Sequence, residues 1–322
     1  MKAAVYFRYG PPDVVEIQEV EKPAPENDQV LIRVRAASVN PLDWHFMRGT
    51  PYFLRLITGL GKPKLPRLGV DVAGEIEAVG SAVTEFQPGD AVFGSCRGAF
   101  AEYVCTAKKA VALKPANITF EEAAAVPVAA LTALQSLRNK GHIQAGQNVL
   151  VNGAAGGVGT FGIQLAKHYG TDVTGVCRAR NVELVRSIGA DRVIDYTKED
   201  FAKTNQRFDL IFDLMGNRSL MVFRGLLKPG GVYVSAGGES GKWMLGAFAR
   251  SFAAPALSAF GSKKLTSMLT KGNPEDLETV RGLLQEGKLK SVVDRIFPLS
   301  QASDAIAYLE QGHARGKVIV TP

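Results

Sequence analysis

The sequence has few of the residues from which disulfides and metal sites are built. Its 322 residues include three cysteines and four histidines, namely Cys96, Cys105, Cys177, His45, His142, His168 and His313. An odd, sparse set of cysteines is typical of a reducing compartment and argues against a disulfide framework. A structural zinc site typically needs four thiolates, and the histidines show no ligand spacing. Composition therefore argues against both a disulfide scaffold and a bound metal.

Long apolar runs and a strong excess of one charge are missing too. The opening "MKAAVYFRYG" reads as a strand rather than as a signal peptide. The most apolar later stretch, 243–261, is interrupted by Arg250 and Pro255, which argues against a transmembrane helix. The net charge of +7 is spread along the chain, which favours a solvated basic surface over nucleic-acid binding. We expect a cytoplasmic protein without a nucleic-acid partner.

The segment 240–264 is both apolar and basic, so a membrane-surface role is one interpretation of it. A core, substrate-lid or dimer-contact role is favoured instead, because its large apolar side chains roughly follow helical spacing. These residues are Trp243, Met244, Leu245, Phe248, Phe252 and Leu257. We therefore do not expect membrane association.

Short strands dominate the first third of the chain. Runs rich in β-branched residues, separated by turns such as "YGPPD" and "FQPGD", lie at 3–7, 14–20, 29–39, 69–80 and 101–107. Such a density of short strands is typical of a partly open β-barrel or a sandwich. From Thr119 the pattern changes from strand-like to helix-like. Thr119 and Glu122 form a capping-box pattern at the start of an Ala/Leu-rich helix predicted over 119–141.

Strands and helices then alternate. Predicted strands at 148–153, 172–177, 192–196, 208–216 and 231–238 are separated by predicted helices at 158–170, 181–190 and 219–231. This alternation indicates βαβ units and a parallel sheet with right-handed crossovers. A final strand, helix and strand, at 292–300, 302–312 and 316–322, return to mixed character.

The fold class expected from this order is α/β, with a β-rich domain into which a doubly wound parallel-sheet domain is inserted. We place the first part of the β-rich domain at 1–119, the inserted domain at 120–286 and the return to the first domain at 287–322.

The turn "NGAAGGVG" joins the first strand of the parallel sheet to its helix. Gly153 ends the strand, Gly156 and Gly157 make the turn, and Gly159 opens the helix. Backbone without side chains lets a pyrophosphate approach the N–H groups at the start of a helix. Tight packing alone is the other interpretation, but the strand before the turn and the amphipathic helix after it favour a dinucleotide.

The residues after the next strand indicate which dinucleotide. An NAD-preferring domain usually has an Asp or Glu about 20 residues past the glycines. This chain has Cys177, Arg178, Ala179 and Arg180 there. Guanidinium groups can form bidentate, charge-assisted bonds to a 2′-phosphate, whereas a carboxylate would repel it. NADPH is therefore the predicted cofactor, the alternative being that the two arginines are solvated loop cations.

Several motifs together resemble a known family. They are "SVNPLDWHFMRGTPY", "GVDVAGEIEAVG", "FQPGDAVFG", "AAAVPVAALTALQSL", "NGAAGGVG" and "GKVIV". In this order they resemble the zinc-independent branch of the medium-chain dehydrogenase/reductase superfamily, which contains quinone oxidoreductases and alkenal or enone reductases. The resemblance implies a GroES-like catalytic domain, an inserted Rossmann domain and, as in many members, a homodimer. Where zinc-dependent members carry a metal-binding Cys and a Gly-His-Glu motif, this chain has Asn40 and Asp71.

The resemblance implies metal-free hydride transfer to the β-carbon of an enal or enone, or to a quinone. The enolate that develops needs hydrogen-bond donors, and a proton must follow. By resemblance, the amide of Asn40 and the hydroxyl of Tyr52 are the candidate catalytic groups. The alternatives are a strand-end cap for Asn40 and a barrel-surface tyrosine for Tyr52. Asp43 either orients these donors or, as we prefer, caps a turn.

The resemblance also implies the cofactor contacts. Thr132 would lie behind the nicotinamide, and the glycine-rich turn would bind the pyrophosphate. The loops after the later strands would bind the other parts of the cofactor. The implied contacts are Thr132, Ala155, Gly156, Gly157, Val158, Cys177, Arg178, Tyr196, Leu214, Met215, Ala236, Gly237, His313, Ala314, Arg315 and Lys317. For the last four, the alternative is a helix-terminating loop whose cations complement the helix dipole.

Two other functions fit the same sequence features. One is an NADPH-binding scaffold or redox-sensing protein with little turnover, and the other is a one-electron quinone reductase. The choice among them depends on which acceptors are reduced and how.

Overall fold

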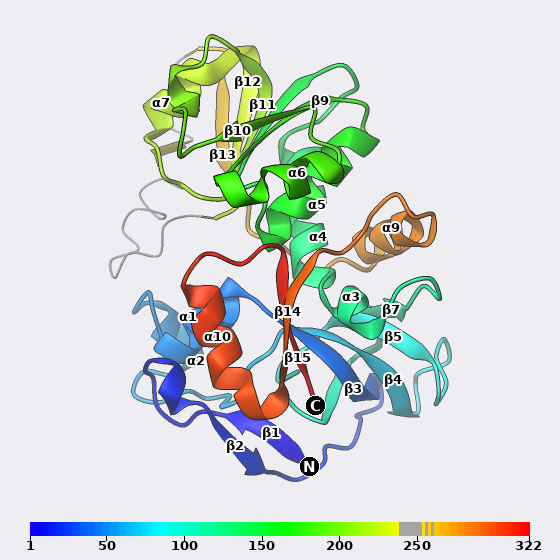
Figure 1. Cartoon of the computed structure of the whole chain (residues 1–322). Helices are drawn as coiled ribbons and strands as arrows, with labels where there is room; N and C mark the ends of the chain where they lie inside the picture. The colour runs from blue at the N-terminus through cyan, green and yellow to red at the C-terminus, as the bar shows by residue number, and fades with distance from the viewer. Residues whose placement is uncertain (238–252, 255–256, 259–260) are drawn as a thin grey trace. The chain divides into compact units, whose positions relative to one another are not determined.

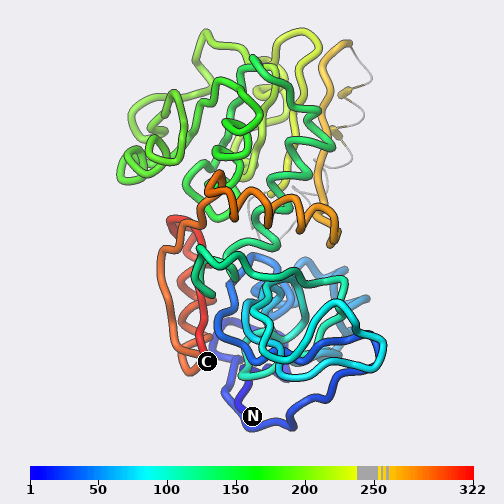
Figure 2. The backbone as a smooth tube through the Cα atoms, turned by 90° about the vertical axis from the view of Figure 1, so that its right-hand side faces the viewer, coloured from blue at the N-terminus to red at the C-terminus, as the bar shows by residue number. Residues whose placement is uncertain are grey.

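The computed structural model describes residues 1–237, 253–254, 257–258 and 261–322, which form two compact units (Figure 1). Unit 1 comprises Met1–Val128 and Gly272–Pro322, and unit 2 comprises Ala129–Lys271. The N-terminal and C-terminal segments, blue and red in Figure 2, therefore belong to the same unit. Most of the apolar and basic segment 240–264, including Trp243, lies outside the described residues.

Unit 1 is built on a seven-stranded sheet in the order β14-β15-β3-β4-β5-β7, with β6 also paired to β3. The long strand β3 (Gln29–Val39) is its centre, because β15, β4 and β6 all pair with it antiparallel. The other strands are β4 (Asp71–Val79), β5 (Ala91–Ser95), β6 (Tyr103–Ala107), β7 (Val111–Leu113), β14 (Val293–Pro298) and β15 (Lys317–Thr321). A separate hairpin joins β1 (Lys2–Val5) to β2 (Glu16–Glu19). The core includes Ile32, Val34, Val72, Val92 and Val318.

The helix predicted over 119–141 begins as expected but is not continuous. Its capping box is confirmed, because Glu122 N donates to Thr119 Oγ1 at 3.2 Å and Thr119 N donates to Glu122 Oε2 at 2.8 Å. The segment then divides into α3 (Phe120–Ala124), α4 (Pro127–Leu134) and a π-helical turn, Gln135–Lys140. The break comes before Pro127, which lacks the N–H needed to continue α3.

Among its described residues, unit 2 contains a six-stranded sheet in which every pairing is parallel. Its order is β10-β9-β8-β11-β12-β13, the doubly wound order in which the first strand lies beside both the second and the fourth. The strands are β8 (Asn148–Asn152), β9 (Asp172–Cys177), β10 (Arg192–Asp195), β11 (Phe208–Asp213), β12 (Leu227–Ser235) and β13 (Lys264–Ser267). Its helices include α5 (Gly157–His168), α6 (Val182–Ser187) and α7 (Leu220–Leu226). The expected fold class, a β-rich domain with an inserted parallel-sheet domain, is confirmed.

The units divide at Val128/Ala129 and Lys271/Gly272, whereas the sequence placed the divisions at 119/120 and 286/287. Packing explains the difference. The helix α9 (Pro274–Gln285) packs against β7, and Asn117 Nδ2 donates to Leu284 O at 3.0 Å. The helix α3 packs on β3 and β4. Both helices therefore belong to the β-rich unit, although their sequences continue the helical texture of the inserted one.

The start of α1 (Pro41–Arg48) is fixed by Asp43, a buried carboxylate. Asn40 N donates to Asp43 Oδ2 at 2.8 Å, and Gly69 N donates to Asp43 Oδ1 at 2.9 Å. Asp43 thus satisfies the backbone at the N-cap of α1 and in the loop before β4, which is a capping role. Burial raises the pKa of Asp43 to about 7, against the opposing effect of these two N–H donors.

The substitution Asp43→Ala is expected to destabilise unit 1, because it leaves Asn40 N and Gly69 N buried without their acceptor. The cost is about 1–3 kcal/mol for each orphaned N–H. Urea unfolding of the two proteins measures it, with the exposed Asp28→Ala as the matched control, expected within about 0.5 kcal/mol of wild type.

The cost should also depend on pH. A native pKa of about 7 exceeds the unfolded value, so the native state holds the extra proton, and the contribution of Asp43 falls as pH rises from about 4 to about 7. Asp43→Ala should therefore cost more at about pH 5 than at about pH 8. An equal cost at both pH values would contradict this assignment.

Candidate active site and cofactor site

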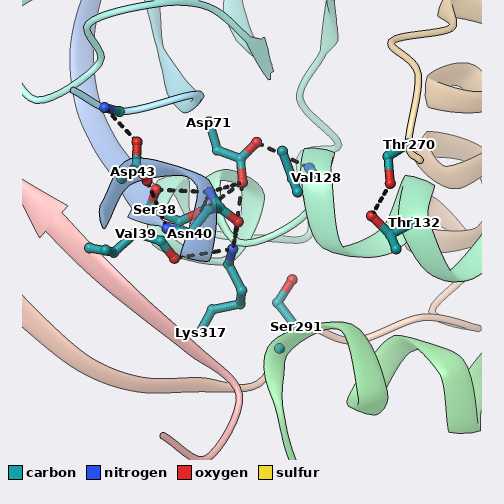
Figure 3. A network of polar contacts seen from close by, with 12 residues as sticks. Ser38, Val39, Asn40, Asp43, Asp71, Val128, Thr132, Thr270, Ser291 and Lys317 are labelled. Carbon is teal, nitrogen blue, oxygen red and sulfur yellow. Dashed lines mark hydrogen bonds and ion pairs between the residues drawn. The ribbon is translucent and has the colours of Figure 1, made fainter. Parts of the chain in front are cut away.

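Unit 1 contains a buried polar cluster, the Asp71 cluster, formed by Ser38, Asn40, Asp71 and Lys317 (Figure 3). Strand pairing brings these residues together. Ser38, near the end of β3, lies directly opposite Asp71, the first residue of β4. Val39 lies opposite Val318 on the other side of β3, which places Lys317 at the start of β15 beside the same strand end. Asn40 follows β3 as the N-cap of α1.

Asp71 is the acceptor at the centre of the cluster and is fully buried. Its Oδ2 accepts from Ser38 Oγ at 2.9 Å and from Asn40 Nδ2 at 2.9 Å. Its Oδ1 accepts from Val128 N at 3.0 Å, in the first turn of α4. Burial raises the pKa of Asp71, while the charge of Lys317 and the hydrogen bonds from Asn40 and Ser38 oppose that rise. The donors around both oxygens favour the ionised form.

Lys317 supplies the positive charge and is only 4% exposed. Its Nζ donates to Asn40 Oδ1 at 2.6 Å and to Val39 O at 3.5 Å, and lies 3.6 Å from Asp71 Oδ2. Burial lowers the pKa of Lys317, and the charges of Asp71 and Asp43 raise it again. The resemblance implied a cofactor contact for this residue, whereas the structure places its ammonium inside the Asp71 cluster.

The geometry narrows the role predicted for Asn40, which is 2% exposed. Its Oδ1 accepts from Lys317, and its Nδ2 donates to Asp71 and, at 3.2 Å, to Ser38 O. Both N–H groups therefore already have acceptors. A substrate oxygen could be bound by Asn40 only in exchange for the longer contact, to Ser38 O. The catalytic role of Asn40 stays a prediction with this restriction, and its capping position is part of the structure.

Tyr52 lies in the loop between α1 and α2 (Leu54–Thr58), and is 63% exposed. The guanidinium of Arg55 lies 4.8 Å from the centre of the Tyr52 ring and 4.4 Å from that of Tyr9. Arg55 Nε also donates to Gly49 O at 3.0 Å, at the end of α1. Arg55 thus links the Tyr52 ring to α1, a contact that no motif in the sequence indicated.

In unit 2, the glycines of the turn meet three different demands. Gly153 has φ +94°, which is strained for other residues, and a Cβ on Gly159 would lie 2.1 Å from Gly153 O, which makes room for α5 against the turn. Among the described residues, a Cβ on Gly156 would meet only Gly153 O, at 3.5 Å. Gly156 is the N-cap of α5 and makes no side-chain cap. The bare position at Gly156 therefore leaves open space beside the helix N-terminus, which fits a pyrophosphate.

Parallel pairing brings the predicted adenosine-side residues together at the carboxyl ends of β9 and β10. Asp195 lies opposite Cys177, and Tyr196 N donates to Cys177 O at 3.1 Å. Arg178 follows Cys177 in the sequence, and both Arg178 and Arg180 are exposed. The carboxylate of Asp195 accepts from Thr197 N at 3.0 Å and Thr197 Oγ1 at 2.7 Å. The exposed guanidiniums, rather than this carboxylate, are thus the charges presented at the strand ends.

A buried carboxylate of unit 2, Asp213, shapes the loops after β8 and β11. It accepts from Asn152 Nδ2 at 2.7 Å, Tyr233 OH at 2.7 Å and the N–H groups of Met215 and Gly216 at 3.1 Å. Sequence reasoning missed Asp213 and Asn152. A signal was present, since each is a polar residue that ends its strand after three apolar residues, and the carboxyl ends of parallel strands lie at one edge of the sheet.

The remaining predicted cofactor contacts are divided between unit 2 and unit 1. Leu214, Met215, Ala236 and Gly237 lie in the loops after β11 and β12, where Ala236 N donates to Asp213 O at 3.0 Å. Thr132, in α4, shares a hydrogen bond with Thr270. His313, Ala314 and Arg315 form the loop before β15 in unit 1, and Arg315 N donates to Asp294 Oδ2 at 3.0 Å. Their cofactor roles stay predictions.

Within the described residues, His, Cys, Asp and Glu side chains form no group of three that could hold a metal ion. No helix in the same part of the chain is long and apolar enough to cross a bilayer.

Comparison with known proteins places the chain in a family. Residues 26–116 match a model described as "Alcohol dehydrogenase GroES-like domain", and residues 188–320 match one described as "Zinc-binding dehydrogenase". The chloroplast envelope quinone oxidoreductase homolog of Arabidopsis thaliana is 34% identical, over 100% of this chain and 98% of its own. The NADPH-dependent alkenal/one oxidoreductase of the same plant is 37% identical, over 100% of this chain and 80% of its own.

A solved structure shows the same fold. The quinone oxidoreductase from Coxiella burnetii is 32% identical and superposes with a TM-score of 0.88, over 100% of this chain and 99% of its own. The parallel sheet with its glycine turn, the β-rich unit and these similarities agree. The chain therefore belongs to the medium-chain dehydrogenase/reductase superfamily, in its quinone oxidoreductase and enone reductase branch, and is an oxidoreductase.

Proposed function

We propose that this protein is an NADPH-dependent, zinc-independent reductase that transfers a hydride to an activated alkene or a quinone. The observation that carries the proposal is the open space at Gly156 beside the N-terminus of α5, combined with exposed guanidiniums at the end of β9. Together they fit a pyrophosphate and a 2′-phosphate. The relative named NADPH-dependent alkenal/one oxidoreductase supports both the cofactor and the acceptor class.

Different residues of unit 2 would bind different parts of the cofactor. The N–H groups of the turn at 155–158 would hold the pyrophosphate, and Arg178 with Tyr196 would bind the adenosine phosphate. Asp213 would keep the loop of Leu214 and Met215 in shape, because its carboxylate accepts from the backbone of Met215 and Gly216. A bound NADPH would supply the hydride.

Unit 1 would serve the acceptor. Hydride addition to an enone moves negative charge onto the carbonyl oxygen, which needs donors in place before the charge arrives. The Asn40 amide would be one donor, in exchange for its contact with Ser38 O. The exposed hydroxyl of Tyr52, whose ring is held by Arg55, would donate a hydrogen bond or the final proton. The Asp71 cluster carries its own cation, Lys317, so this chemistry needs no metal.

The cytoplasmic location, the homodimer and the absence of membrane association stay predictions. The Arabidopsis relatives are named as chloroplast proteins.

The substitutions Gly156→Ala and Gly159→Ala should act differently on the same turn. Gly156→Ala should fold normally, since its Cβ meets one atom at 3.5 Å, but should weaken NADPH binding about 10- to 100-fold by filling the pyrophosphate space. Gly159→Ala should lower stability by about 1–3 kcal/mol, since its Cβ would lie 2.1 Å from Gly153 O. Fluorescence titration and thermal unfolding separate the two effects. Unchanged NADPH affinity in Gly156→Ala would contradict the site.

Arg178→Ala should raise the KM for NADPH about 10- to 100-fold, because it removes one charge-assisted bond to the 2′-phosphate. The KM for NADH should change less than about twofold, since NADH lacks that phosphate. The control is Arg207→Ala, an exposed arginine directly before β11 and so at the amino edge of the same sheet. Equal effects on both cofactors would remove Arg178 from the phosphate site.

Steady-state NADPH oxidation against a panel of enals, enones and quinones, with product analysis, tests the function itself. We expect turnover with loss of the activated C=C bond or reduction of the quinone to the hydroquinone. A semiquinone signal in electron paramagnetic resonance would indicate one-electron reduction instead. Tight NADPH binding with oxidation by none of the acceptors would favour a scaffold or redox-sensing role and would refute the proposed reductase.

A further inference from the structure

The Asp71 cluster joins segments that are far apart in the sequence. Ser38 and Asn40 lie at the junction of β3 and α1, Asp71 begins β4, and Lys317 begins β15, 277 residues after Asn40. Through Val128 N, Asp71 also reaches the first turn of α4. Each connection is made by a side chain that is nine-tenths or more buried. The cluster is therefore a rigid junction and not a chance surface contact (Figure 3).

The partners of Asn40 determine which way its amide points. An ammonium can only donate and an ionised carboxylate can only accept. Lys317 therefore requires the oxygen Oδ1 on its side, at 2.6 Å, and Asp71 requires the nitrogen Nδ2 on its side, at 2.9 Å. The reversed amide would place two donors together on one side and two acceptors on the other. This arrangement also polarises the amide, since accepting from an ammonium at Oδ1 strengthens donation from Nδ2.

The contacts of Lys317 leave its ammonium directed into the protein. Asn40 Oδ1, Val39 O and Asp71 surround Nζ, and the residue is 4% exposed. A direct contact with a cofactor phosphate would require the ammonium to leave these partners and strand Asp71 as a buried, uncompensated charge. Such a loss is costly.

We propose that Lys317 is a positioning residue for the reduction, which fixes and polarises the Asn40 amide and keeps Asp71 ionised, and is not a contact of the cofactor. The proposal rests on the proposed function. It assigns to Lys317 an effect on turnover that is separate from NADPH affinity. It also explains how the cluster holds a buried carboxylate in its charged form, because the compensating cation, Lys317, is part of the chain.

The charge of Lys317 has a consequence for pH dependence. The titratable groups that act on Lys317 are Asp71 at the start of β4 and Asp43 in α1. The same two carboxylates, together with burial, raise the pKa of the Cys96 thiol after β5. Without the ammonium, the pKa of Asp71 rises further, because burial then acts with less opposition. A protonated Asp71 would present an O–H to the cluster and release the Asn40 amide. Turnover would then be lost as pH falls.

The experiment compares three variants of the full chain with the wild type, using the best acceptor of the panel. Lys317→Met removes the charge and keeps most of the stem. The double variant Asp71→Asn with Lys317→Met makes the pair neutral and removes the titrating carboxyl. Lys109→Met, at an exposed position just before β7, is the matched control. For each protein, kcat, KM and their pH profiles are measured, and the Kd for NADPH is determined by fluorescence titration without turnover.

Lys317→Met should lower kcat about 10- to 100-fold, as expected for a misplaced reacting group. Its Kd for NADPH should stay within about twofold of wild type, since no cofactor phosphate loses a charged partner. Its kcat should be lost as pH falls, at higher pH values than in the wild type. The double variant should lack this acid limb, because the amide introduced by Asp71→Asn does not titrate. Lys109→Met should match wild type in every measurement.

Two results would overturn the proposal. One is a tenfold weaker Kd for NADPH with unchanged kcat, which would make Lys317 a cofactor contact. The other is an unchanged kcat and pH profile, which would make it a packing residue. If Lys317→Met does not fold, the neutral double variant is measured instead. A wild-type kcat in that variant refutes the proposal, and a low kcat with a normal Kd for NADPH supports it. A wild type that reduces no acceptor refutes the proposed function, and with it this role of Lys317. An active wild type whose kcat does not change in Lys317→Met refutes this role alone.

Discussion

Unit 1 depends on a charge that the chain must bury and neutralise for itself. Asp71 begins β4 with a fully buried carboxylate, and a buried charge is tolerated only with a counter-charge and hydrogen bonds to its lone pairs. The counter-charge comes from Lys317, near the C-terminus, and reaches Asp71 because β15 and β4 pair on opposite sides of β3. This requirement gives the last strand a reason to return to the first unit. It also fixes Asn40, Ser38 and the first turn of α4 around one point.

Unit 2 shows how one short turn satisfies separate constraints. Gly153 needs a positive φ, Gly159 needs close approach of α5, and Gly156 leaves space that no side chain of the described part of the chain fills. The first two are requirements of folding, and the third fits the proposed pyrophosphate site. Asp213 stabilises the loops around the turn, because its carboxylate accepts hydrogen bonds from Asn152 in β8 and from the backbone after β11. The result is a rigid strand edge on which exposed arginines offer positive charge.

The sequence predicted those parts of the molecule that follow from local patterns. The parallel sheet, the glycine turn and the capping box at Thr119 could be found because periodicity, glycine spacing and Thr-x-x-Glu act over a few residues. The helix break at Pro127 was signalled by the proline itself and should have been predicted. The short helices α1 and α2 and the short strands β5, β7 and β13 were missed, because brief segments carry too little periodicity to distinguish them from loops. The 12-residue helix α9 was missed as well, although its length gave periodicity enough.

The candidate site could be predicted only in part, because its key contacts are non-local. Asn40 and Lys317 were singled out individually by family resemblance, but their mutual hydrogen bond spans 277 residues and follows from strand register. The same is true of Asp71 and Lys317, and of the Arg55 guanidinium that holds Tyr52. Family resemblance implied that Lys317 lies near the cofactor, and the structure places its ammonium in the Asp71 cluster, where the residue is 4% exposed.

The property on which the Asp71 cluster depends is that Asp71 and Lys317 form an ionised pair that sets the Asn40 amide. Neutron diffraction from a deuterium-exchanged crystal at neutral pH would test it most directly, because it locates each proton. We predict three deuterons on Lys317 Nζ, none on the carboxyl oxygens of Asp71, and Asn40 Nδ2 directed at Asp71. A neutral Lys317, a protonated Asp71, or an amide with Oδ1 facing Asp71 would contradict it.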